Sequence, residues 1–569
     1  MVESGQIRYI GLPILDSLVT NPLGPAVPLV VGGLALVFLA RWRRPVWHSV
    51  FALGVIGISG LLWFSLANLT IPAELVRPWD AILIPVGELV WRVDGWAWLG
   101  GMLALCVAAI DILYNWDSAG WRTARLHTYH LLALAATLTV TSATNLLTLA
   151  MCWILFEVTL FARNVTRPRA VSAALGSAGA LLIWLALVVA GSAGAQAPML
   201  SDIVSPLARA LLLIAVLWRV AGYPLHFWFT AEKPPAGLTA LSDYLLPAVV
   251  GLVLLGRIYN PGAAMTLQQP TWFALMLVAL LGTGLVAWLD AALDRSLLYV
   301  VVNRATWAMA AVIFMPVTGP AAVVWPMLTV ALGISGLLVG LMIARAWAWR
   351  WPLGIAMLCL LGIPGTVGFP VMASLAQLPS LTTDLLPGFA LLRWLLVILA
   401  EALAVAALLR HWPRAGSERS VPTWSTPGRI FAARHLAGFV LFAVPMLALG
   451  LRPPLVEAWL GSSGTALIFE PVITQVRALP LWFWILQALS LAGAYLLLRT
   501  RQQVLTNQET RARALVHIAS LTWLQNIIRV AGGFLSKASF ALAWILDGEG
   551  YVGWVIVTGL LMWLMLGGL

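Results

Sequence analysis

The apolar stretches of this 569-residue chain contain few ionisable residues, and Arg219 is the most prominent of them. It opens the segment 219–228, RVAGYPLHFW, in which a Gly/Tyr/Pro interruption follows the charge. A charge at membrane depth costs at least about 2.5 kcal/mol, and such charges commonly mark ion or proton pathways. The alternative is an arginine that pairs with a carboxylate only to hold two helices together.

Two carboxylates are natural partners of this arginine, Glu157 in an earlier apolar stretch and Asp243 in the next one along the chain. Deprotonating an arginine near neutral pH would cost on the order of 8 kcal/mol, because its pKa exceeds about 12. Arg219 is thus a fixed positive charge, and Glu157 or Asp243 would take up and release protons. A permanent buried ion pair is the other interpretation.

Glu401 and His226 are two further positions that could carry chemistry. Glu401 follows Arg393 by eight residues, a little over two helical turns, and is either an acid at the exit of a proton path or half of a pair that reaches for the membrane surface. His226 either titrates near neutral pH or caps a helix after the interruption. Asp111 is expected at the inner membrane interface, and His127 and His130 are expected to be interfacial and not ligands.

The composition identifies a membrane protein. Hydrophobic residues make up 61% of the chain and charged residues 10%, and the mean hydropathy is +0.94, which excludes a soluble globular protein. The first twenty residues lack the features of a signal peptide. The three cysteines lie singly and no Gly-rich nucleotide loop occurs, so we expect no metal, no cofactor and no bound nucleotide.

The net charge of +11 comes from basic residues that cluster in alternate loops. This pattern determines membrane orientation and does not indicate nucleic-acid binding. It predicts a multi-pass protein of the bacterial inner (plasma) membrane with both termini on the outer face. The clusters are Arg41, Arg43 and Arg44; Arg122 and Arg125; Arg163, Arg167 and Arg169; Arg345 and Arg350; and Arg410, Arg414, Arg419 and Arg429.

Apolar windows of about 20 residues predict an all-α polytopic fold of about 16 transmembrane helices. Gly/Pro interruptions at 222–224 and 362–365 lie about 140 residues and five spans apart, which predicts an inverted five-helix repeat with broken helices in spans 7 and 12. The alternative is that Gly and Pro are simply common in membrane helices. The spans are expected near 24–41, 48–69, 96–115, 127–144, 146–163, 169–190, 205–222, 240–258, 270–290, 295–315, 321–344, 353–376, 388–410, 434–451, 480–499 and 550–569.

The segment Arg501–Asp547 differs from the rest. It opens polar and becomes amphipathic from Leu515 to Leu546, which is typical of a helix lying along the membrane surface; a loosely ordered loop suits its first fifteen residues better. The predicted organisation is a three-span N-terminal region (1–125), a first repeat (126–260), a second repeat (261–412), two further spans (413–499), the amphipathic lateral helix (500–548) and a C-terminal span (549–569).

Several motifs follow one another between about residues 90 and 375. They are WRVDG at 91–95, NLLTL at 145–149 with Trp153, the broken helix at 219–226, the helix at 239–257 with Gly251 and Arg257, DRSLLY at 294–299 with Asp294 and Arg295, and GIPGTVGF at 362–369. Their order and spacing resemble the antiporter-like membrane subunits shared by respiratory complex I, Mrp-type cation/proton antiporters and membrane-bound hydrogenases. The amphipathic stretch before the last span most resembles subunit L of complex I.

The chain departs from this family where the family carries its proton relay. Ile154 stands where the family has a glutamate directly after the fifth-span tryptophan, and Glu157 is three residues further on, about 4.5 Å along a helix and on a similar face. The seventh-span lysine is Arg219 and the eighth-span histidine is Asp243. The twelfth-span lysine is Met372, and the eleventh span has no ionisable residue.

The resemblance implies proton translocation within a multi-subunit membrane complex, with other membrane subunits and the lipid bilayer as partners and no nucleic acid. It favours a subunit of a complex I-like NADH-quinone oxidoreductase assembly, in which this chain would transport and any bond-making would belong to the whole. One alternative is the membrane subunit of an inorganic-carbon (bicarbonate) accumulation complex. Another is a non-conducting assembly scaffold, because relay residues are missing, and a transporter of a small organic solute is a more distant option.

Overall fold

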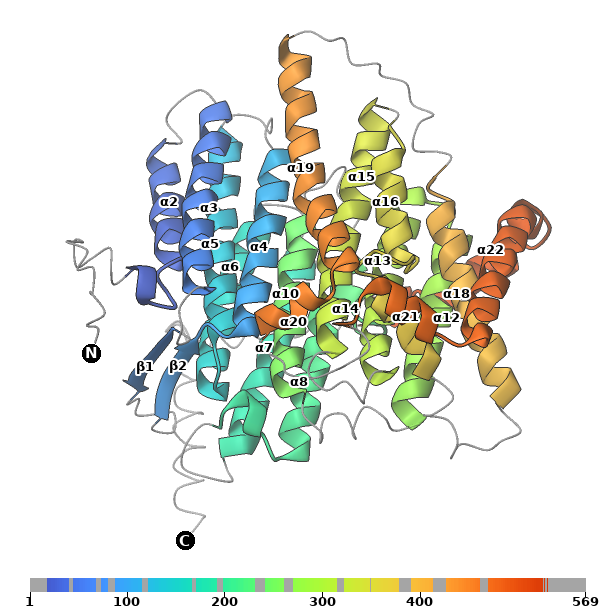
Figure 1. The fold of residues 1–569 in the computed structure, drawn as a ribbon, viewed down its shortest axis with the longest axis horizontal. Helices are drawn as coiled ribbons and strands as arrows, with labels where there is room; N and C mark the ends of the chain where they lie inside the picture. Colours follow the sequence, from blue (N-terminus) through green and yellow to red (C-terminus); the bar gives the residue numbers. More distant parts are fainter. Residues whose placement is uncertain are drawn as a thin grey trace, which may run out of the picture. The chain divides into compact units, whose positions relative to one another are not determined.

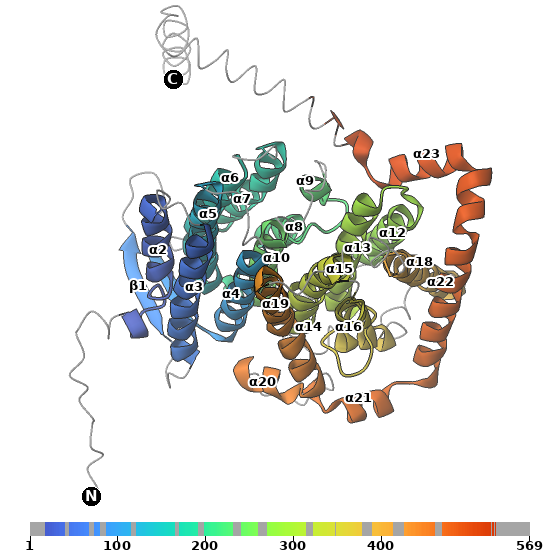
Figure 2. The same ribbon diagram turned by 90° about the horizontal axis from the view of Figure 1, so that it is seen from above.

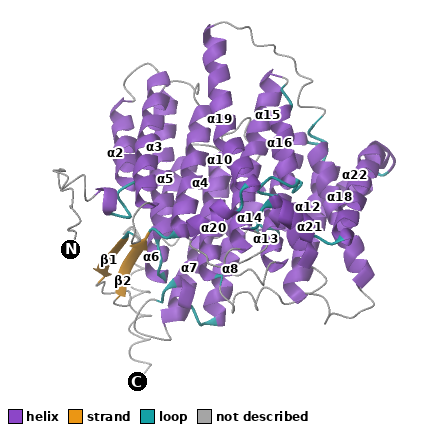
Figure 3. Ribbon diagram, viewed as in Figure 1, coloured by secondary structure: helices purple, strands orange, loops and turns teal. Residues whose placement is uncertain are grey.

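The computed structural model is mostly helical (Figures 1 and 3). It describes residues 18–39, 45–67, 73–79, 87–114, 121–165, 170–191, 198–230, 241–259, 270–314, 322–347, 349–377, 390–412, 426–460, 469–524, 526–527 and 530. Contacts divide the chain into two units, Met1–Ala519 and Ser520–Leu569. Most of the second unit lies outside the described residues, including the span expected at 550–569, so the fold is that of the first unit.

The first half of this unit is a bundle of antiparallel helices, with a core made mostly of Leu, Ala, Val and Trp side chains. Helix α5 packs on α2, α4 and α6, α7 packs on α6 and α8, and α10 packs on α4 and α8. The helices are α2 (Ala26–Leu39), α3 (Pro45–Ala67), α4 (Gly95–Tyr114), α5 (Trp121–Ser142), α6 (Leu146–Val165), α7 (Ala170–Gly191), α8 (Pro206–Arg219), α9 (Phe227–Thr230) and α10 (Leu241–Ile258).

The second half contains α12 packed on α13 and α18, and α15 packed on α16. Its helices are α12 (Pro270–Leu289), α13 (Leu293–Phe314), α14 (Val324–Leu328), a π-helical segment (Thr329–Ile334), α15 (Ser335–Trp347), α16 (Trp351–Leu360), α17 (Phe369–Ala373), α18 (Ala390–Leu409), α19 (Thr426–Leu451), α20 (Pro454–Leu460), α21 (Val472–Ala478), α22 (Leu481–Asn507) and α23 (Glu509–Ala519), with short 3-10 turns at Leu200–Asp202 and Ser374–Gln377.

Each expected span from 24–41 to 480–499 overlaps described helix. Among the described residues, seven helices are long and apolar enough to cross a bilayer by length and composition. The chain is therefore a multi-pass membrane protein. The seven are Val46–Leu66, Gly95–Tyr114, Thr271–Leu289, Val324–Arg345, Leu392–Leu409, Ala433–Leu451 and Leu481–Asn507.

A β-hairpin departs from the all-α expectation. Strands β1 (Glu74–Trp79) and β2 (Gly87–Arg92) pair antiparallel, and Figure 3 shows them in orange at the foot of the N-terminal helices. Strand β2 ends at Arg92, inside the WRVDG motif. The side-chain hydroxyl of Thr148 accepts a hydrogen bond of 2.7 Å from the Val90 amide, which ties β2 to the first turn of α6.

Helices end just before both Gly/Pro interruptions, 222–224 and 362–365. Helix α8 ends at Arg219, where the Gly222 amide donates to Leu217 O (2.8 Å) and the Ala221 amide to Trp218 O (3.2 Å). This is the Schellman arrangement, which puts the residue two positions after the last helical residue in the left-handed region. Ala221 occupies that position with φ +54°, although it is not a glycine.

Helix α16 ends with the same arrangement. The Ile363 amide donates to Leu358 O (3.0 Å) and the Gly362 amide to Cys359 O (2.9 Å). Here the left-handed residue is Gly362, with φ +68°. By this alignment Leu360 corresponds to Arg219 as the last helical residue before each break.

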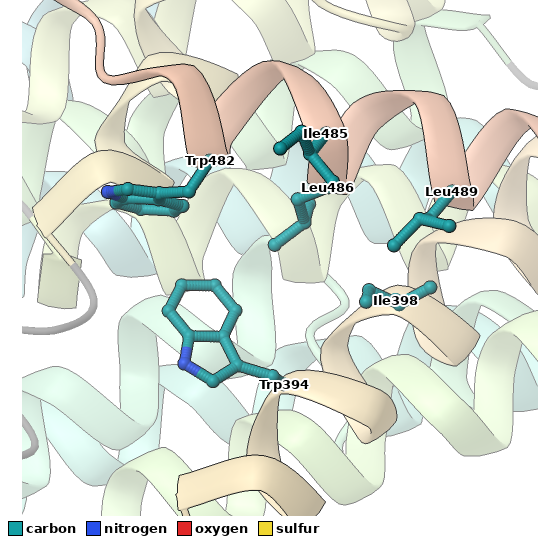
Figure 4. Close-up of a pocket in the computed structure, with 6 residues that line it drawn as sticks. All are labelled: Trp394, Ile398, Trp482, Ile485, Leu486 and Leu489. Carbon is teal, nitrogen blue, oxygen red and sulfur yellow. The ribbon is translucent and has the colours of Figure 1, made fainter.

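The C-terminal helices of the first unit enclose one end of the second half (Figure 2). Helix α22 packs along α18, and an apolar pocket of about 400 Å³ lies between them. In Figure 4, Trp482 and Trp394 face each other at one end of this pocket. Arg501 of α22 is buried and donates to Trp288 O (2.7 Å) and Asp290 O (3.2 Å), two carbonyls at the end of α12.

The expectation of a loose loop after the fifteenth span is wrong. Residues 501–507 continue α22, and α23 follows at Glu509–Ala519. Arg501, the first residue of this stretch, donates to carbonyls at the end of α12, where a cation is favoured by their partial negative charge. Residues 531–547 of the expected lateral helix lie outside the described part of the chain.

Candidate functional site

Arg219 and Glu157 form a buried ion pair. The Nη2 atom of Arg219 contacts Oε1 of Glu157, and the two residues are 1% and 7% exposed. Oε1 also accepts a 2.9 Å hydrogen bond from the indole N–H of Trp153, one turn earlier on α6. The carboxylate three residues beyond the family position therefore does reach the arginine of the broken helix.

Small residues make room for the Arg219 side chain. A Cβ on Gly176 of α7 would lie 3.3 Å from Nη1 of Arg219, and one on Gly179 would lie 3.5 Å from Nε. On the other side, a Cβ on Gly251 of α10 would lie 3.1 Å from the Cβ of Arg219. Three glycines from two neighbouring helices thus let the guanidinium group lie inside the bundle.

Aromatic rings complete this enclosure. The guanidinium carbon lies 5.8 Å from the ring centroid of Phe156 and 5.9 Å from that of Trp228. Trp228 is fixed by a 2.5 Å hydrogen bond from its indole N–H to Trp218 O, just before the end of α8. Cation–π contacts of this kind stabilise a desolvated guanidinium group by about 2 kcal/mol.

Of the two predicted partners, Glu157 is the one paired with Arg219. Asp243 lies half-buried in the first turn of α10. The α10 residue in contact with Arg219 is Gly251, eight residues later and about 12 Å along the helix axis. Asp243 is therefore placed about two turns away from the level at which α10 meets the arginine.

A second buried ion pair joins Arg304 of α13 to Glu401 of α18. Nη1 of Arg304 lies 3.1 Å from Oε1 and 3.3 Å from Oε2 of Glu401, and both residues are 2% exposed. The same nitrogen donates to Leu360 O at 3.2 Å, the last residue of α16 before its break. A cation at a helix C-terminus is stabilised by the helix dipole.

Sequence reasoning missed Arg304 and placed Glu401 beside Arg393 of its own helix. The signal that could have found Arg304 is its distance from the start of its helix. Glu157 lies eleven residues after Leu146, the first residue of α6, and Arg304 lies eleven residues after Leu293, the first residue of α13. The corresponding position thus carries a charge in both halves.

His226 lies between the two pairs in sequence and is fully buried. Its ring stacks on Tyr223 with centroids 5.1 Å apart, and Tyr299 of α13 meets its edge at 5.4 Å. Its carbonyl accepts the Phe229 amide at 2.9 Å. The backbone of His226 thus begins α9, while its side chain packs between aromatic rings from both halves of the unit.

Asp294 and Arg295 lie apart from the buried pairs. Asp294 is 3.5 Å from Arg345, and these side chains are 65% and 42% exposed. Arg295 is 39% exposed and lies 3.3 Å from Asp290 at the end of α12. These contacts join the start of α13 to its neighbours at the bundle surface.

Met372, which stands where the antiporter-like family has a lysine, lies in apolar surroundings. Met372 is 1% exposed, and its sulfur accepts the indole N–H of Trp307 at 2.6 Å. The eleventh span has no ionisable side chain from Val324 to Ala344. Neither position 372 nor the stretch Val324–Ala344 therefore supplies a charged side chain between the Arg219 and Arg304 ion pairs.

Asp94 of the WRVDG motif, two residues after the hairpin, forms one more ion pair. Arg257, at the end of α10, donates to Oδ1 of Asp94 at 2.9 Å and to Thr141 O at 2.8 Å. Asp94 also accepts the Ala97 amide at 2.8 Å and so caps the start of α4. This pair fixes α4, α5 and α10 to one another, which explains why both motif residues are present.

These pairs determine the chemistry that the site can perform. An arginine remains charged, so the carboxylates are the groups that can exchange protons. A glutamate that takes up a proton leaves its arginine as a buried, uncompensated charge, at a cost of about 3–5 kcal/mol. No group of three His, Cys, Asp or Glu side chains that could hold a metal ion occurs among the residues that the structure describes.

No protein-family model and no curated protein matches the chain, but solved structures match its fold. A chain of the Mrp complex from Dietzia sp. DQ12-45-1b is 18% identical with a TM-score of 0.61, over 95% of this chain and 63% of that one. A chain of respiratory complex I from Thermus thermophilus is 20% identical with a TM-score of 0.54, over 76% of this chain and 98% of that one. This chain thus spans less than two thirds of the Mrp complex chain that it matches. It has the fold of the antiporter-like membrane subunits of multi-subunit complexes, as its motifs predict.

Proposed function

We propose that the chain is a proton-translocating membrane subunit of a complex I-like NADH-quinone oxidoreductase assembly, in which Glu157 and Glu401 carry protons and Arg219 and Arg304 are fixed counter-charges. The observation that carries the proposal is the Arg219–Glu157 contact, buried to 1% and 7% exposure at the end of a broken helix. The chemistry of this chain is transport, and electron transfer belongs to partner subunits.

The proposed cycle alternates between paired and unpaired carboxylates. While Glu157 is ionised, it neutralises Arg219 and no net charge is buried. Proton uptake by Glu157 frees the Arg219 charge, and the cost of about 3–5 kcal/mol must come from elsewhere in the assembly. A conformational change or a charge presented by a partner subunit would supply it. The proton then leaves when the ion pair forms again.

The second pair lets the same step occur in the other half. Arg304 is held by both Glu401 and the Leu360 carbonyl, so it keeps one acceptor when Glu401 is protonated. The end of α16 therefore lowers the cost of freeing this arginine. We expect Glu401 to exchange its proton more readily than Glu157, whose arginine is surrounded by glycines and aromatic rings.

One set of observations favours a second function, a non-conducting assembly scaffold. The eleventh span is apolar from Val324 to Ala344, and Met372 packs against Trp307 where the related proteins carry a lysine. A continuous relay between the two pairs would need water alone to bridge this region. In a scaffold, both ion pairs would be permanent and would only hold helices together.

Vesicles containing the complete assembly distinguish the two functions. Glu157→Gln and Glu401→Gln should each reduce the rate of pH-gradient formation at least tenfold, while the subunits still co-purify. Glu74→Gln is the matched control, because Glu74 is exposed on β1 and distant in sequence from both pairs. Unchanged gradient formation in both test variants, with the assembly intact, would establish the scaffold instead.

The identity of the assembly is a separate question with its own measurement. Extraction in a mild detergent and identification of the co-purifying subunits should yield other complex I-like subunits. Recovery of a large soluble zinc protein instead would assign the chain to an inorganic-carbon accumulation complex. Neither result tests the roles of Glu157 and Glu401, which the vesicle assay measures separately.

A further inference from the structure

Asp111 of α4 and His130 of α5 form a buried acid–imidazole pair outside the site described above. Nδ1 of His130 lies 3.3 Å from Oδ2 of Asp111, and the residues are 1% and 4% exposed. Nε2 of His130 lies 3.1 Å from Ala108 O. Both residues are buried inside the protein, where α3, α5 and α19 pack on α4.

A second imidazole lies one turn away on α5. His127 is 1% exposed, and its Nε2 is 2.9 Å from the hydroxyl of Ser49 on α3. His127 and His130 are three residues apart and so lie on neighbouring positions of one helix face. Other titratable or charged side chains on the described parts of the packed elements are His48 (α3), Glu88 and Arg92 (β2), Cys106 and Tyr114 (α4), Arg125 and Tyr129 (α5), Cys152 and Glu157 (α6), Asp243, Tyr244 and Arg257 (α10), Arg434 and His435 (α19), and Glu457 (α20).

His130 lies at the same depth as Glu157. Helix α5 ends at Ser142, twelve residues after His130, and α6 begins at Leu146, eleven residues before Glu157. At 1.5 Å per residue the two side chains are about 18 and 17 Å from the same turn. Because α5 and α6 pack together, the two titratable groups occupy adjacent helices at one level of the bundle.

We propose that Asp111 and His130, with His127 and Ser49 beside them, form a proton-binding site that exchanges a proton with the site at Glu157. The proposal rests on the proposed proton translocation. It adds a second proton-binding site, in which the proton is held between a carboxylate and an imidazole. Unlike the glutamate–arginine pairs, this pair consists of two groups that can each bind and release a proton, a carboxylate and an imidazole.

The charge of the pair determines when it binds its proton. With one proton the pair is neutral, as aspartic acid beside imidazole or as aspartate beside imidazolium. Without it, one negative charge is buried, and burial disfavours that state. The pair therefore favours the protonated, neutral state, and it can release the proton when a neighbouring charge changes.

Infrared difference spectroscopy between two pH values, on the full chain in lipid vesicles, tests the site without an activity measurement. The wild-type chain should show carboxyl and imidazole bands that titrate together with one midpoint between about pH 5 and pH 9. Labelling the aspartate carboxyl carbons with ¹³C should shift the carboxyl band. Asp111→Asn should remove it, and His130→Gln should move its midpoint by at least about one pH unit, a tenfold change in proton affinity.

Asp290→Asn is the matched control, because Asp290 is also a buried aspartate but lies 3.3 Å from Arg295, which does not titrate. The titrating band should persist in this variant and in Glu157→Gln, so the result does not depend on the role of Glu157. Isotope labelling of the wild-type chain keeps the test valid if Asp111→Asn does not fold. Absence of a titrating aspartate band over this range, or its persistence in Asp111→Asn, overturns the proposal.

Discussion

Glu157 and Arg304 occupy the same position in α6 and α13, eleven residues after the first residue of each helix, and carry opposite charges. Each is paired with the complementary residue from a different helix, Arg219 of α8 and Glu401 of α18. Each half thus contains a neutral ion pair beside a broken helix, but the acidic residue lies on α6 in the first half and the basic residue lies on α13 in the second. A carboxylate next to an arginine is available in each half.

Removing one member of the second pair should destabilise the protein strongly. Glu401→Gln leaves Arg304 as a buried charge with only neutral acceptors, the Leu360 carbonyl and the new amide oxygen, so the free energy of unfolding should fall by about 3–5 kcal/mol. The double variant Arg304→Gln/Glu401→Gln should recover most of this loss, because two amides can bond to each other without a charge. Thermal unfolding in one detergent measures all three proteins.

Glu509→Gln is the control for this comparison. Its partner Arg513 lies one turn away on α23, and the two side chains are 61% and 77% exposed. The expected change is at most about 1 kcal/mol. A loss for Glu401→Gln no larger than that of Glu509→Gln would contradict the buried pair.

The membrane fold could be predicted from the sequence because apolar length and Gly/Pro interruptions act locally. The broken helices at 222–224 and 362–365 needed only the knowledge that these residues end helices. The hairpin partner β1 was not predicted, because Glu74–Trp79 is short and includes a proline and two charged residues. The continuation of α22 to Asn507 was missed because residues 501–507 are mostly polar and resemble a loop in sequence.

The pairing of charges could be predicted only in part. Glu157 and Asp243 were equally plausible partners of Arg219 in sequence, and the packing of Gly251 against the arginine decides between them. Glu401 was assigned to Arg393 because both lie on α18, whereas its partner Arg304 is 97 residues away. Such contacts depend on which helix faces which, and hydropathy does not contain that information.

Replacing Arg219 by lysine tests whether residue 219 must keep its charge. A buried lysine loses its proton at a lower pH than an exposed one, whereas arginine remains charged. We expect Arg219→Lys to retain pH-gradient formation near neutral pH and to lose it progressively between about pH 8 and pH 10. The wild-type assembly should show no such loss attributable to residue 219, and Arg219→Gln should be inactive over the whole range.

The control for this series is Arg513→Lys on the exposed surface of α23, which should follow the wild-type pH profile. Identical profiles for Arg219→Lys and wild type would mean that the charge at position 219 does not participate in transport.

The space beside Arg219 should tolerate no added methyl group. In Gly251→Ala the new Cβ would lie 3.1 Å from the Arg219 Cβ and 3.3 Å from Val220 Cγ2, so α8 and α10 must separate and the free energy of unfolding should fall by about 1–3 kcal/mol. Gly57→Ala on α3 is the matched control, because nothing lies within 4 Å of its added Cβ. It should stabilise α3 by about 0.5–1 kcal/mol through helix propensity. Equal effects of the two variants on the unfolding midpoint would argue against close packing at Gly251.

The two helix breaks predict opposite effects of exchanging alanine and glycine. Ala221 holds the left-handed position after α8, with φ +54°, where a Cβ costs about 1–2 kcal/mol. Glycine removes this cost, but it raises the conformational entropy of the unfolded chain, which lowers the free energy of unfolding by about 0.4–1 kcal/mol. Ala221→Gly should therefore raise the free energy of unfolding by about 0.5–1 kcal/mol. The matched position after α16 is Gly362, with φ +68°.

At position 362 the reverse substitution, glycine to alanine, is unfavourable for two reasons. The Cβ of Gly362→Ala would lie 2.0 Å from Met372 Cγ and 3.1 Å from Gly368 O, so steric overlap adds to the unfavourable φ. The free energy of unfolding should fall by at least about 2 kcal/mol. Unfolding midpoints of the two variants, measured in one detergent against the wild-type chain, should move in opposite directions. A decrease for Ala221→Gly would mean that the left-handed turn after Arg219 is not the stable conformation of the break, and the position of the Arg219 guanidinium would then have to be revised with it.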